Sequence, residues 1–431
     1  MQIPVDRRRF LSTSAAVGTA FGFFTSTSMA EERVSASDTL TVAVLGVNGQ
    51  GRNHVKHFAQ QPGVEVAYIC DVDERVIPRA IAIAEEHQKR KPVGVRDFRT
   101  LLDDKSIDIV SIAMPNHWHA PATIMACAAG KHVYVEKPCS QTAEEGELAV
   151  QAARKYGRVV QMGNQRRSRA HYIEAIGKIQ AGEIGDVLLS RTWYNSRRGS
   201  IGVGKPAEVP KELDYALWQG PAPERPYKDN LLHYNWHWHW HWGNGELGNN
   251  GIHAIDVARW GMDVDYPTRV TSTGSRVRFD DDQETPDTHF VAFHFGERMI
   301  TWEGLSWSPY GPGGSRFGTS FHGDKGSMHL HDSGYTIFDL QNKALETVTR
   351  SGGDPEHYAS FLAAIRSGGR PSSDIEDAHQ STLLCHLGNI AHRVGRPVET
   401  NPENGHLVND TEAQQLWGRE YRQGWEPEGI A

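Results

Sequence analysis

Cysteine, long apolar runs and excess positive charge are all scarce in this 431-residue chain. The four cysteines are Cys70, Cys127, Cys139 and Cys385, and no two of them form a CxxC pair. This usage predicts free thiols rather than a disulfide framework. Beyond residue 30 no apolar run approaches the length of a membrane span, so we expect a soluble mature protein without a membrane anchor.

The charge balance excludes further classes of partner. The formal net charge is −8, and removal of the first 30 residues, which carry Asp6 and three arginines, makes it −10. An acidic chain of this kind is not typical of proteins that bind nucleic acid or an anionic membrane surface. The sequence also contains no internal repeat and no low-complexity segment.

Residues 1–30 resemble a twin-arginine export signal. Arg7-Arg8-Arg9 precede an apolar stretch of small residues that ends in Ser28-Met29-Ala30, the pattern of a signal-peptidase site. An uncleaved anchor or a chance basic N-terminus is the alternative. We therefore expect a periplasmic or otherwise exported protein. Proteins with such signals are exported already folded, often with a bound cofactor. Residues 31–38 would form a polar linker between the signal and the folded chain.

A glycine-rich turn organises the chain that follows. Thr41 to Leu45 is an apolar β-branched run, and Gly46, Gly49 and Gly51 come directly after it. A helical stretch and a second strand then lead to Asp71, which lies 20 positions after Gly51. The spacing is G-x-x-G-x-G rather than G-x-G-x-x-G, and a tight βα turn is the blander alternative. Strand, turn, helix and acid together predict a dinucleotide site with Asp71 on the adenosine ribose.

Strands and helices continue to alternate up to Gly163. We predict helices at 76–88, 98–103, 120–129 and 142–156, the last with a capping box from Thr142 to Glu145, and strands at 107–114, 132–135 and 158–162. The loop 115–119 then lies at the carboxyl edge of a parallel sheet, where ligands bind. Lys137 follows its strand directly, in Glu136-Lys137-Pro138, whereas an ordinary surface lysine lies on a helix face.

The remaining length requires a second domain, because 401 residues exceed what one hydrophobic core supports. We predict a helix at 168–182, a strand at 187–194, a functional loop at 198–227 and a helix at 249–260. Antiparallel strands follow at 270–279, 289–295, 299–305, 315–322, 326–331 and 336–339. Helices at 357–368 and 375–393 then pack back on the first domain.

Tryptophan and histidine alternate from Trp236 to Trp242. In an extended chain the indoles would face one side and the imidazoles the other. One interpretation is a zinc site, but no cysteine or acid completes a ligand set, and we predict no metal. Aromatic filler is another alternative. We favour a sugar-binding wall, because indoles cover C–H faces and imidazoles bind hydroxyls. The predicted substrate-binding residues are Arg166, Trp236, His237, Trp238, His239 and His241.

Five segments, GVNGQGR, CDVD, PNHWH, AGKHVYVEKP and GNNGIHAIDVARW, together resemble the Gfo/Idh/MocA family of nicotinamide-dependent sugar and cyclitol oxidoreductases. The resemblance covers about residues 40 to 395. It implies an α/β protein with a Rossmann domain at 39–164 and an α+β domain at 165–395 that carries a large, mostly antiparallel open sheet, followed by a tail at 396–431. It also implies a homodimer or homotetramer formed through the outer face of that sheet.

The same resemblance implies the site residues. Lys137 would position and activate the reacting hydroxyl, often with Pro138 in the cis form, and His253 would transfer the proton. The family keeps an aspartate where this chain has Asn249, which orients groups but takes no proton. The cofactor-binding residues are Gly46, Asn48, Gly49, Gln50, Gly51, Arg52, Asp71, Pro115, Asn116, His119, Glu136 and Lys137.

We therefore predict an oxidoreductase that moves a hydride between a sugar or cyclitol carbon and tightly bound NAD. Asp71 would repel a 2′-phosphate, and Val72-Asp73 offers no arginine, so NAD is favoured over NADP. A periplasm offers no useful pool of free nicotinamide, so the cofactor must be recycled where it is bound. The first alternative is a redox-neutral glycosidase or epimerase that oxidises its substrate transiently. A sugar-binding sensor without catalysis is a third.

Overall fold

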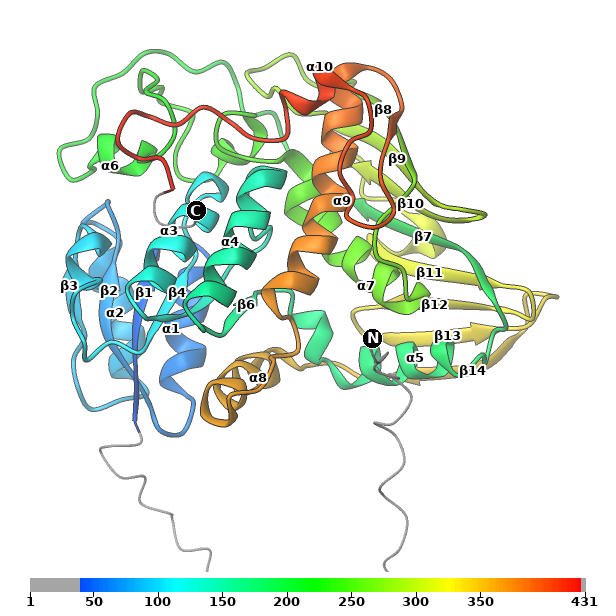
Figure 1. Cartoon of the computed structure of the whole chain (residues 1–431), viewed down its shortest axis with the longest axis horizontal. Helices are drawn as coiled ribbons and strands as arrows, with labels where there is room; N and C mark the ends of the chain where they lie inside the picture. The colour runs from blue at the N-terminus through cyan, green and yellow to red at the C-terminus, as the bar shows by residue number, and fades with distance from the viewer. Residues whose placement is uncertain (1–38, 428–431) are drawn as a thin grey trace, which may run out of the picture.

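The computed structural model describes residues 39–427, and the predicted export signal lies outside them. The chain forms two sheets side by side, with helices between them and around the first (Figure 1). The first sheet has six parallel strands in the order β3-β2-β1-β4-β5-β6. The strands are β1 (Leu40–Leu45), β2 (Val64–Cys70), β3 (Val93–Val95), β4 (Ile109–Ile112), β5 (His132–Val135) and β6 (Val160–Met162). The predicted Rossmann fold is confirmed.

The helices of this domain are α1 (Gly51–Ala59), α2 (Ile77–Glu85), α3 (Asn116–Ala128) and α4 (Ala143–Lys155). Three local predictions need correction. The helix predicted at 98–103 is a 3₁₀ turn, η3 (Phe98–Leu101). The predicted loop 115–119 is instead the first turn of α3, because Pro115 stands in extended conformation at the N-cap and the residues after it continue the helix.

The capping box at α4 is only half formed. The Thr142 hydroxyl accepts a hydrogen bond from the Glu145 backbone N–H at 3.3 Å, as predicted. The Glu145 carboxylate, however, accepts from the backbone N–H of Gln141 at 3.1 Å rather than from that of Thr142. Arg419, from the C-terminal tail, forms an ion pair with the same carboxylate at 2.6 Å. A long-range partner thus decides how Glu145 is oriented.

The second sheet has nine strands in the order β14-β13-β12-β11-β7-β10-β9-β8-β15. They are β7 (Val187–Asn195), β8 (Arg269–Ser275), β9 (Thr288–Phe295), β10 (Arg298–Leu305), β11 (Phe317–Gly323), β12 (Ser327–His331), β13 (Gly334–Phe338), β14 (Ala344–Thr349) and β15 (Val398–Glu399). All pairs are antiparallel except β7 with β10. The mostly antiparallel sheet is confirmed. The strands β14 and β15 were not predicted, because one is largely exposed and the other has two residues.

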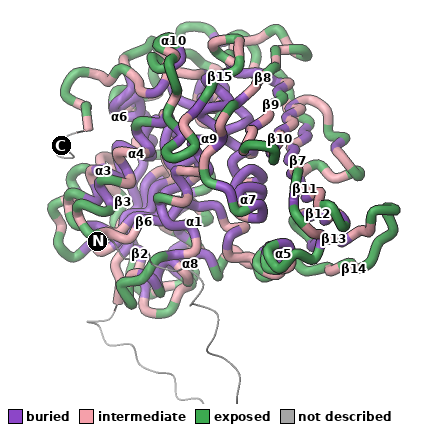
Figure 2. The backbone as a smooth tube through the Cα atoms, turned by 45° about the vertical axis from the view of Figure 1, so that its right-hand side comes forward, coloured by how far each residue is buried: buried purple, intermediate pink, exposed green. Residues whose placement is uncertain are grey.

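Helices cover one face of this sheet. α7 (Ile252–Met262) contacts β7, β10 and β11, and α9 (Ile375–Val394) contacts β8 and β9 on one side and α4 and β6 on the other. Both are mostly buried between the sheets (Figure 2). α5 (Ala170–Gln180) packs on α7, and α8 (Asp354–Ser367) reaches α1, so the two C-terminal helices pack back on the first domain as predicted. The short helices are α6 (Tyr215–Gln219) and α10 (Thr411–Gln414).

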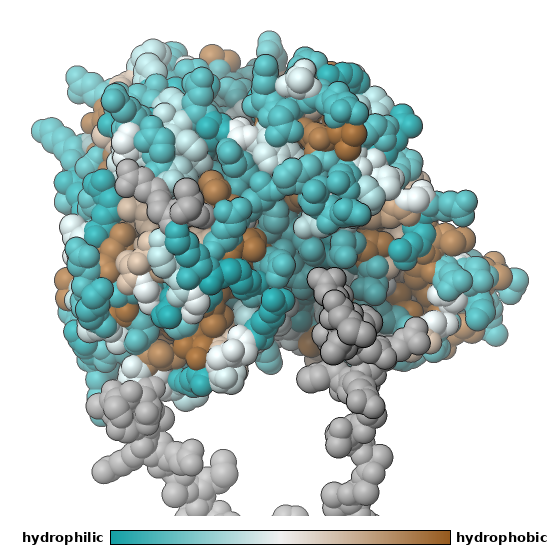
Figure 3. Space-filling view, viewed as in Figure 1, coloured by the Kyte–Doolittle hydropathy of each residue, from teal (hydrophilic) through white to brown (hydrophobic). Residues whose placement is uncertain are grey.

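The surface in Figure 3 is mainly hydrophilic, with apolar residues gathered towards the β11 to β14 end of the large sheet. Of the helices that the structure describes, none has the length and apolar character needed to cross a membrane. The four cysteines are all buried and unpaired.

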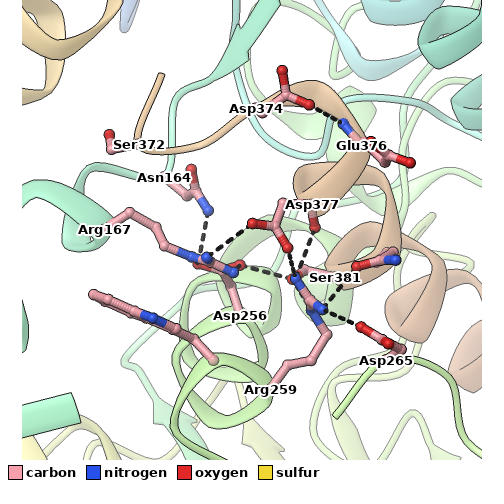
Figure 4. Close-up of polar contacts among 12 residues, drawn as sticks. Asn164, Arg167, Asp256, Arg259, Asp265, Ser372, Asp374, Glu376, Asp377 and Ser381 are labelled. Carbon is pink, nitrogen blue, oxygen red and sulfur yellow. Dashed lines mark hydrogen bonds and ion pairs between the residues drawn. The ribbon is translucent and has the colours of Figure 1, made fainter. Parts of the chain in front are cut away.

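A buried network of charged side chains connects the two domains (Figure 4). Asp256 on α7 is 1% exposed, and its carboxylate accepts from Arg167 at 2.8 and 2.9 Å and from Ser381 on α9 at 2.7 Å. Asn164, at the end of the first domain, donates to it at 2.7 Å. Burial alone would raise the pKa of Asp256, but the Arg167 charge and these hydrogen bonds hold it below its usual value.

We expect Asp256→Asn to lower the free energy of unfolding by about 3 to 5 kcal/mol, because it leaves the buried Arg167 cation with only Asp377, at 3.3 Å, as an acidic partner. Since the native pKa of Asp256 is lowered, its contribution is present above the unfolded pKa and is lost as pH falls through the native one. Urea unfolding of wild type and variant at neutral pH measures the difference. The control is Asp265→Asn, whose ion pair with Arg259 spans 3.6 Å with the acid side chain 72% exposed, and it should change little. Equal stability of Asp256→Asn and the control would contradict this role.

Candidate active site

A cavity of about 670 Å³ opens at the carboxyl ends of β1, β2, β4 and β5, where the strand order of the first sheet reverses. This is the switch point at which doubly wound sheets bind their ligands. Residues of the first domain line one side of it, and residues from the long loop and the start of α7 line the other. We call it the main cavity.

The glycine turn forms the end of the main cavity nearest α1. Gly46 has a φ of +79°, and a Cβ there would lie 2.7 Å from the Ala113 carbonyl oxygen, so only glycine fits. A Cβ on Gly49 would meet nothing within 4 Å, which leaves room for a phosphate beside the backbone. Of the predicted residues, Gly46, Asn48, Gly49 and Gln50 line the cavity, whereas Gly51 packs beneath the turn and Arg52 is absent from the lining.

Asp71 lines the same end and is firmly oriented. Its carboxylate accepts hydrogen bonds from the backbone N–H groups of Val47 at 2.7 Å and Asp73 at 3.0 Å. Burial raises the pKa of Asp71, and these two hydrogen bonds oppose the shift. Arg96, which follows β3, also lines this end. The sequence argument considered only Val72-Asp73, whereas the neighbouring strand supplies the guanidinium.

Lys137 lies at the opposite end, directly after β5, and its peptide bond to Pro138 is cis. Its ammonium donates to the carbonyl oxygen and the Oδ1 of Asn249, both at 3.0 Å. Burial lowers the pKa of Lys137, while Glu136 and Glu246 oppose that shift. Both Lys137 and Asn249 line the main cavity, so residues 112 positions apart meet at one point.

Glu136 contacts the backbone of Lys137 and the side chain of His54. Its carboxylate accepts from the Lys137 backbone N–H at 3.2 Å and pairs with His54 at 3.1 Å. His54 in turn contacts the Ser111 hydroxyl at 2.9 Å. Burial favours a raised pKa for Glu136, but the His54 hydrogen bond and the nearby cations hold it below the usual value. Glu136 and the predicted Pro115, Asn116 and His119 all line the main cavity.

The helix that carries Asn249 opens with a π-helical turn, η6 (Leu247–Gly251), and continues as α7. Such turns are frequent at functional sites. His253 lies one turn beyond Asn249 but is absent from the main-cavity lining, and its Nδ1 has no partner among the described residues. Burial, with the charges of Arg166 and Lys137, places its pKa well below the usual value, so the imidazole is neutral.

The predicted alternation of tryptophan and histidine is wrong. Residues Asn235–Trp238 form a 3₁₀ helix, η5, and turns follow, so the side chains do not divide between two faces. Two indoles of this segment, Trp236 and Trp242, pack into an apolar cluster whose other members are Leu213, Tyr215, Trp218, Ala222 and Leu231. Burial of these rings replaces the strand partner that an extended segment would need.

As a result, the predicted substrate residues are scattered. Trp236 and His237 line the main cavity, and Trp238, His239 and His241 do not. His241 lies instead in a second cavity. Arg166 is also absent from the main cavity, because it pairs with Asp332 at 2.9 Å and lies 4.1 Å from the Phe317 ring centre. Among residues 39–427, no group of three or more histidine, cysteine or acidic side chains is arranged to hold a metal ion.

Sequence reasoning missed several lining residues. Arg198 is the first residue of the predicted functional loop, and this position was the only feature of the sequence that could have indicated it. Its guanidinium donates to buried Glu246 at 2.7 Å and to the Tyr234 hydroxyl at 2.9 Å. Burial favours a lower pKa, but the Glu246 charge raises the pKa of Arg198 overall. The other missed residues include Met114, Tyr194, Trp218, His233, Tyr234 and Asn250.

His237 has a defined tautomer. Its Nδ1–H donates to the Tyr234 carbonyl oxygen at 2.6 Å, which leaves Nε2 as an acceptor. Burial lowers the pKa of His237 to about 3, so the ring is neutral at any working pH. Because His237 lines the main cavity, it offers a hydroxyl group a fixed hydrogen-bond acceptor.

Comparison with known families agrees with this arrangement. Residues 40–164 match the NAD-binding Rossmann domain of the Gfo/Idh/MocA oxidoreductases, and residues 191–427 match their C-terminal α/β domain. The chain belongs to the Gfo/Idh/MocA oxidoreductase family. The family predicted from five short segments is thus confirmed.

Curated relatives in this family differ in their named activities. A glycosyl hydrolase family 109 protein of Shewanella pealeana is 32% identical over 166 residues, which are 37% of this chain and 36% of that protein. An inositol 2-dehydrogenase of Salmonella paratyphi B is 33% identical over 153 residues, 35% of this chain and 44% of that one. The match spans less than half the length of either relative.

Solved structures of oxidoreductases share the fold over most of the chain. An aldose-aldose oxidoreductase from Caulobacter crescentus, solved with glycerol, is 21% identical with a TM-score of 0.64, covering 84% of this chain and 99% of that one. A levoglucosan dehydrogenase solved with NADH and levoglucosan is 20% identical with a TM-score of 0.64 and the same coverage. The WlbA dehydrogenase from Bordetella pertussis, solved with NADH and UDP-GlcNAcA, is 20% identical with a TM-score of 0.62, again covering 84% and 99%.

We expect Lys137→Ala to lower turnover by about 100-fold or more while the nucleotide stays bound, because the ammonium lies at the end of the main cavity opposite the glycine turn. Steady-state kinetics and the absorbance of bound nucleotide measure both effects. Lys56→Ala, an exposed lysine on α1, is the matched control and should behave like wild type. Near-full activity of Lys137→Ala on a confirmed substrate would remove Lys137 from the site.

Proposed function

We propose that the protein transfers a hydride between a hydroxyl-bearing carbon of a sugar or cyclitol and an NAD that remains bound through the cycle. The observation that carries this proposal is the Lys137 ammonium, held at 3.0 Å by Asn249 in the same cavity as the glycine turn and Asp71. A cation fixed at one end of a nucleotide-sized site is suited to stabilise an oxygen that gains negative charge.

The residues that line the main cavity fit a bound NAD. The open backbone at Gly49 would receive the pyrophosphate, and Asp71 would accept hydrogen bonds from the ribose. When bound there, the nicotinamide supplies the hydride acceptor and donor. Lys137 would donate a hydrogen bond to the reacting oxygen and lower the energy of its alkoxide. His253, neutral and one turn from Asn249, lies outside the cavity lining, so it is proposed to take the hydroxyl proton through an intervening water.

The substrate class follows from the other side of the main cavity. Trp236, Tyr194 and Tyr234 offer apolar ring faces, and Arg198, His237 and Asn250 offer polar groups. This mixture suits a polyhydroxylated ring better than an aliphatic alcohol. The sugar ligands named for the levoglucosan and WlbA dehydrogenases agree with this class.

A long segment closes over the nucleotide end and supports tight retention of NAD. We call residues 212–236 the strap. The strap bonds to the first domain through Glu74 N to Glu212 O at 3.1 Å and Asp214 N to Val72 O at 2.9 Å. The His233 imidazole contacts the Asp73 carboxylate at 2.8 Å. His233 and Tyr234 line the main cavity, so the strap would cover a nucleotide bound there.

The C-terminal tail holds the strap from outside, as the red and green segments at the top left of Figure 1 show. Arg422 donates its backbone N–H to the Pro221 carbonyl oxygen at 3.0 Å. The indole N–H of Trp118 donates to Trp218 O at 2.9 Å, and the Trp425 ring packs on Trp118 with centroids 5.3 Å apart. Release of NAD would require several of these contacts to break.

A redox-neutral glycosidase or epimerase is the second candidate. An enzyme that retains NAD must restore it within each cycle, either with a second substrate or by returning the hydride to the same molecule. The strap therefore favours this chemistry as well, and several curated relatives are named as glycosyl hydrolase family 109 proteins. A sensor without catalysis would not require a lysine fixed by two hydrogen bonds.

Export and oligomerisation complete the proposal. Export through the twin-arginine route rests on Arg7-Arg8-Arg9 and would be tested by fractionation of cells that express the full chain.

The proposal of a homodimer or homotetramer rests on the outer face of the large sheet, where Leu188 and Phe290 are 53% and 41% exposed. Light scattering that reports a monomer would exclude it.

We expect the purified protein to carry NAD(H) through gel filtration and to release it only on denaturation, with NADP(H) in the minority. His233→Ala should raise the rate of NAD(H) loss by roughly tenfold, because it removes a contact that anchors the strap. Chromatography of the released nucleotide measures identity and rate. His87→Ala, an exposed histidine after α2, is the control. Predominantly NADP(H) would overturn the cofactor assignment, and unchanged loss in His233→Ala would overturn the role of the strap.

Two assays separate the candidate reactions. Incubation with aryl glycosides and no added acceptor releases the aryl group if the protein is a redox-neutral glycosidase. A lasting absorbance of reduced nicotinamide with free sugars or cyclitols indicates the dehydrogenase, which we expect. Turnover of simple alcohols without any response to hexoses, cyclitols, uronates or disaccharides would contradict the substrate class.

A further inference from the structure

A second cavity, of about 450 Å³, lies on the outer side of the segment that follows the strap. It forms where five parts of the chain meet: the residues before α4, the strap at 223–225, the segment 240–244, the C-terminal half of α9 and the tail at 415–420. It shares no lining residue with the main cavity. Its volume suits one or two sugar rings.

The buried wall of this cavity carries an acceptor without a partner. Asn244 is 5% exposed, and its Nδ2 donates to the Gln141 carbonyl oxygen at 2.8 Å, which fixes the orientation of the amide. Asn389 donates to the Asn244 backbone carbonyl oxygen at 2.9 Å and holds the residue in place. The Asn244 Oδ1 has no hydrogen-bond partner among residues 39–427. Because this oxygen is fully buried, it lies behind the cavity surface, and a ligand in the cavity would reach it only if Asn244 moved.

The mouth of the cavity carries a cation without a partner. The Arg393 guanidinium lies 5.4 Å from the centre of the Trp240 ring, and no hydrogen bond or ion pair joins it to another described residue. Arg393 is exposed, so its guanidinium is open to a ligand. Arg225 also lines the cavity, and its ion-pair partner Glu284 is 3.6 Å away. Two acids, Glu224 and Glu420, line the cavity as well, and Glu224 pairs with Arg422 at 2.7 Å.

Two further groups favour a carbohydrate. The Trp240 indole lines the cavity and offers an apolar surface to the C–H groups of a pyranose. The His241 Nε2–H donates to the Pro223 carbonyl oxygen at 2.7 Å, which leaves Nδ1 as an acceptor. The cavity thus combines a guanidinium, an indole face and an accessible acceptor.

We propose that the second cavity binds a pyranose that carries a carboxylate, such as a uronate. Its carboxylate would pair with the planar fork of Arg393, its ring would pack on Trp240 and one hydroxyl would donate to His241 Nδ1. The planar fork binds a carboxylate through two parallel hydrogen bonds. No residue of the proposed reaction takes part, so this site stands or falls independently of the proposed function.

Isothermal titration of the full chain with D-glucuronate tests the site. We expect binding that weakens roughly tenfold or more in Arg393→Gln and in Trp240→Leu, since a charge-assisted hydrogen bond or a ring contact is lost. D-glucose should bind wild type at least about tenfold more weakly than D-glucuronate for the same reason. Arg79→Gln, an exposed arginine on α2, and Lys137→Ala, in the main cavity, should both bind like wild type.

Each alternative result is decisive. Absence of binding by wild type at about 10 mM glucuronate, far above the range of useful affinity, would overturn the proposal. Equal binding by Arg393→Gln and wild type would remove the carboxylate contact, and loss of binding only in Lys137→Ala would place the ligand in the main cavity. Phosphate that binds as tightly as glucuronate would reassign the site to small anions and overturn its carbohydrate character.

Discussion

The buried contact between Arg167 and Asp256 holds together the parts from which the main cavity is built. Arg167 follows the last strand of the Rossmann domain, and Asp256 lies in the middle of α7. Both groups are almost inaccessible to water, and a second acid, Asp377, lies 3.3 Å from Arg167. Asn249 lies about two turns before Asp256 in the same helical run, and it meets Lys137 of the first domain at 3.0 Å. A structural ion pair thus helps to hold the helix that brings Asn249 to Lys137.

The acids near Lys137 are paired with other side chains, so the Lys137 ammonium is not neutralised by a carboxylate. Glu136 is paired with His54, and Glu246 with Arg198, so both acids are occupied. The histidines near the lysine are neutral, since burial lowers their pKa values. Lys137 contacts only neutral oxygens of Asn249 through its ammonium. Its charge is thus available for an oxygen of the substrate rather than cancelled by a carboxylate.

The segment from the strap to Asn244 gives both cavities part of their walls. Trp236 and His237 face the main cavity, and Trp240, His241 and Asn244 face the second one. Trp236 and Trp242 both belong to the apolar cluster that contains Leu213 and Trp218 of the strap. The same aromatic packing that closes the nucleotide end thus also shapes the second cavity. A ligand in either cavity would contact one side of a single packed segment.

The features that the sequence alone determined are those set by near neighbours in the chain. The glycine turn and Asp71 belong to one strand, turn, helix and strand, and Lys137 follows its strand directly, so spacing was sufficient to place them at the edge of the sheet. The tertiary structure decided whatever depended on distant partners. Arg96 reaches the main cavity from the neighbouring strand, and Arg166 pairs with Asp332 outside that cavity. Glu145 forms its ion pair with Arg419 of the tail. The tryptophan and histidine segment folds into turns, and two of its indoles are buried in an apolar cluster with Leu213 and Trp218. That packing depends on residues outside the segment, so no periodicity within it records the fold.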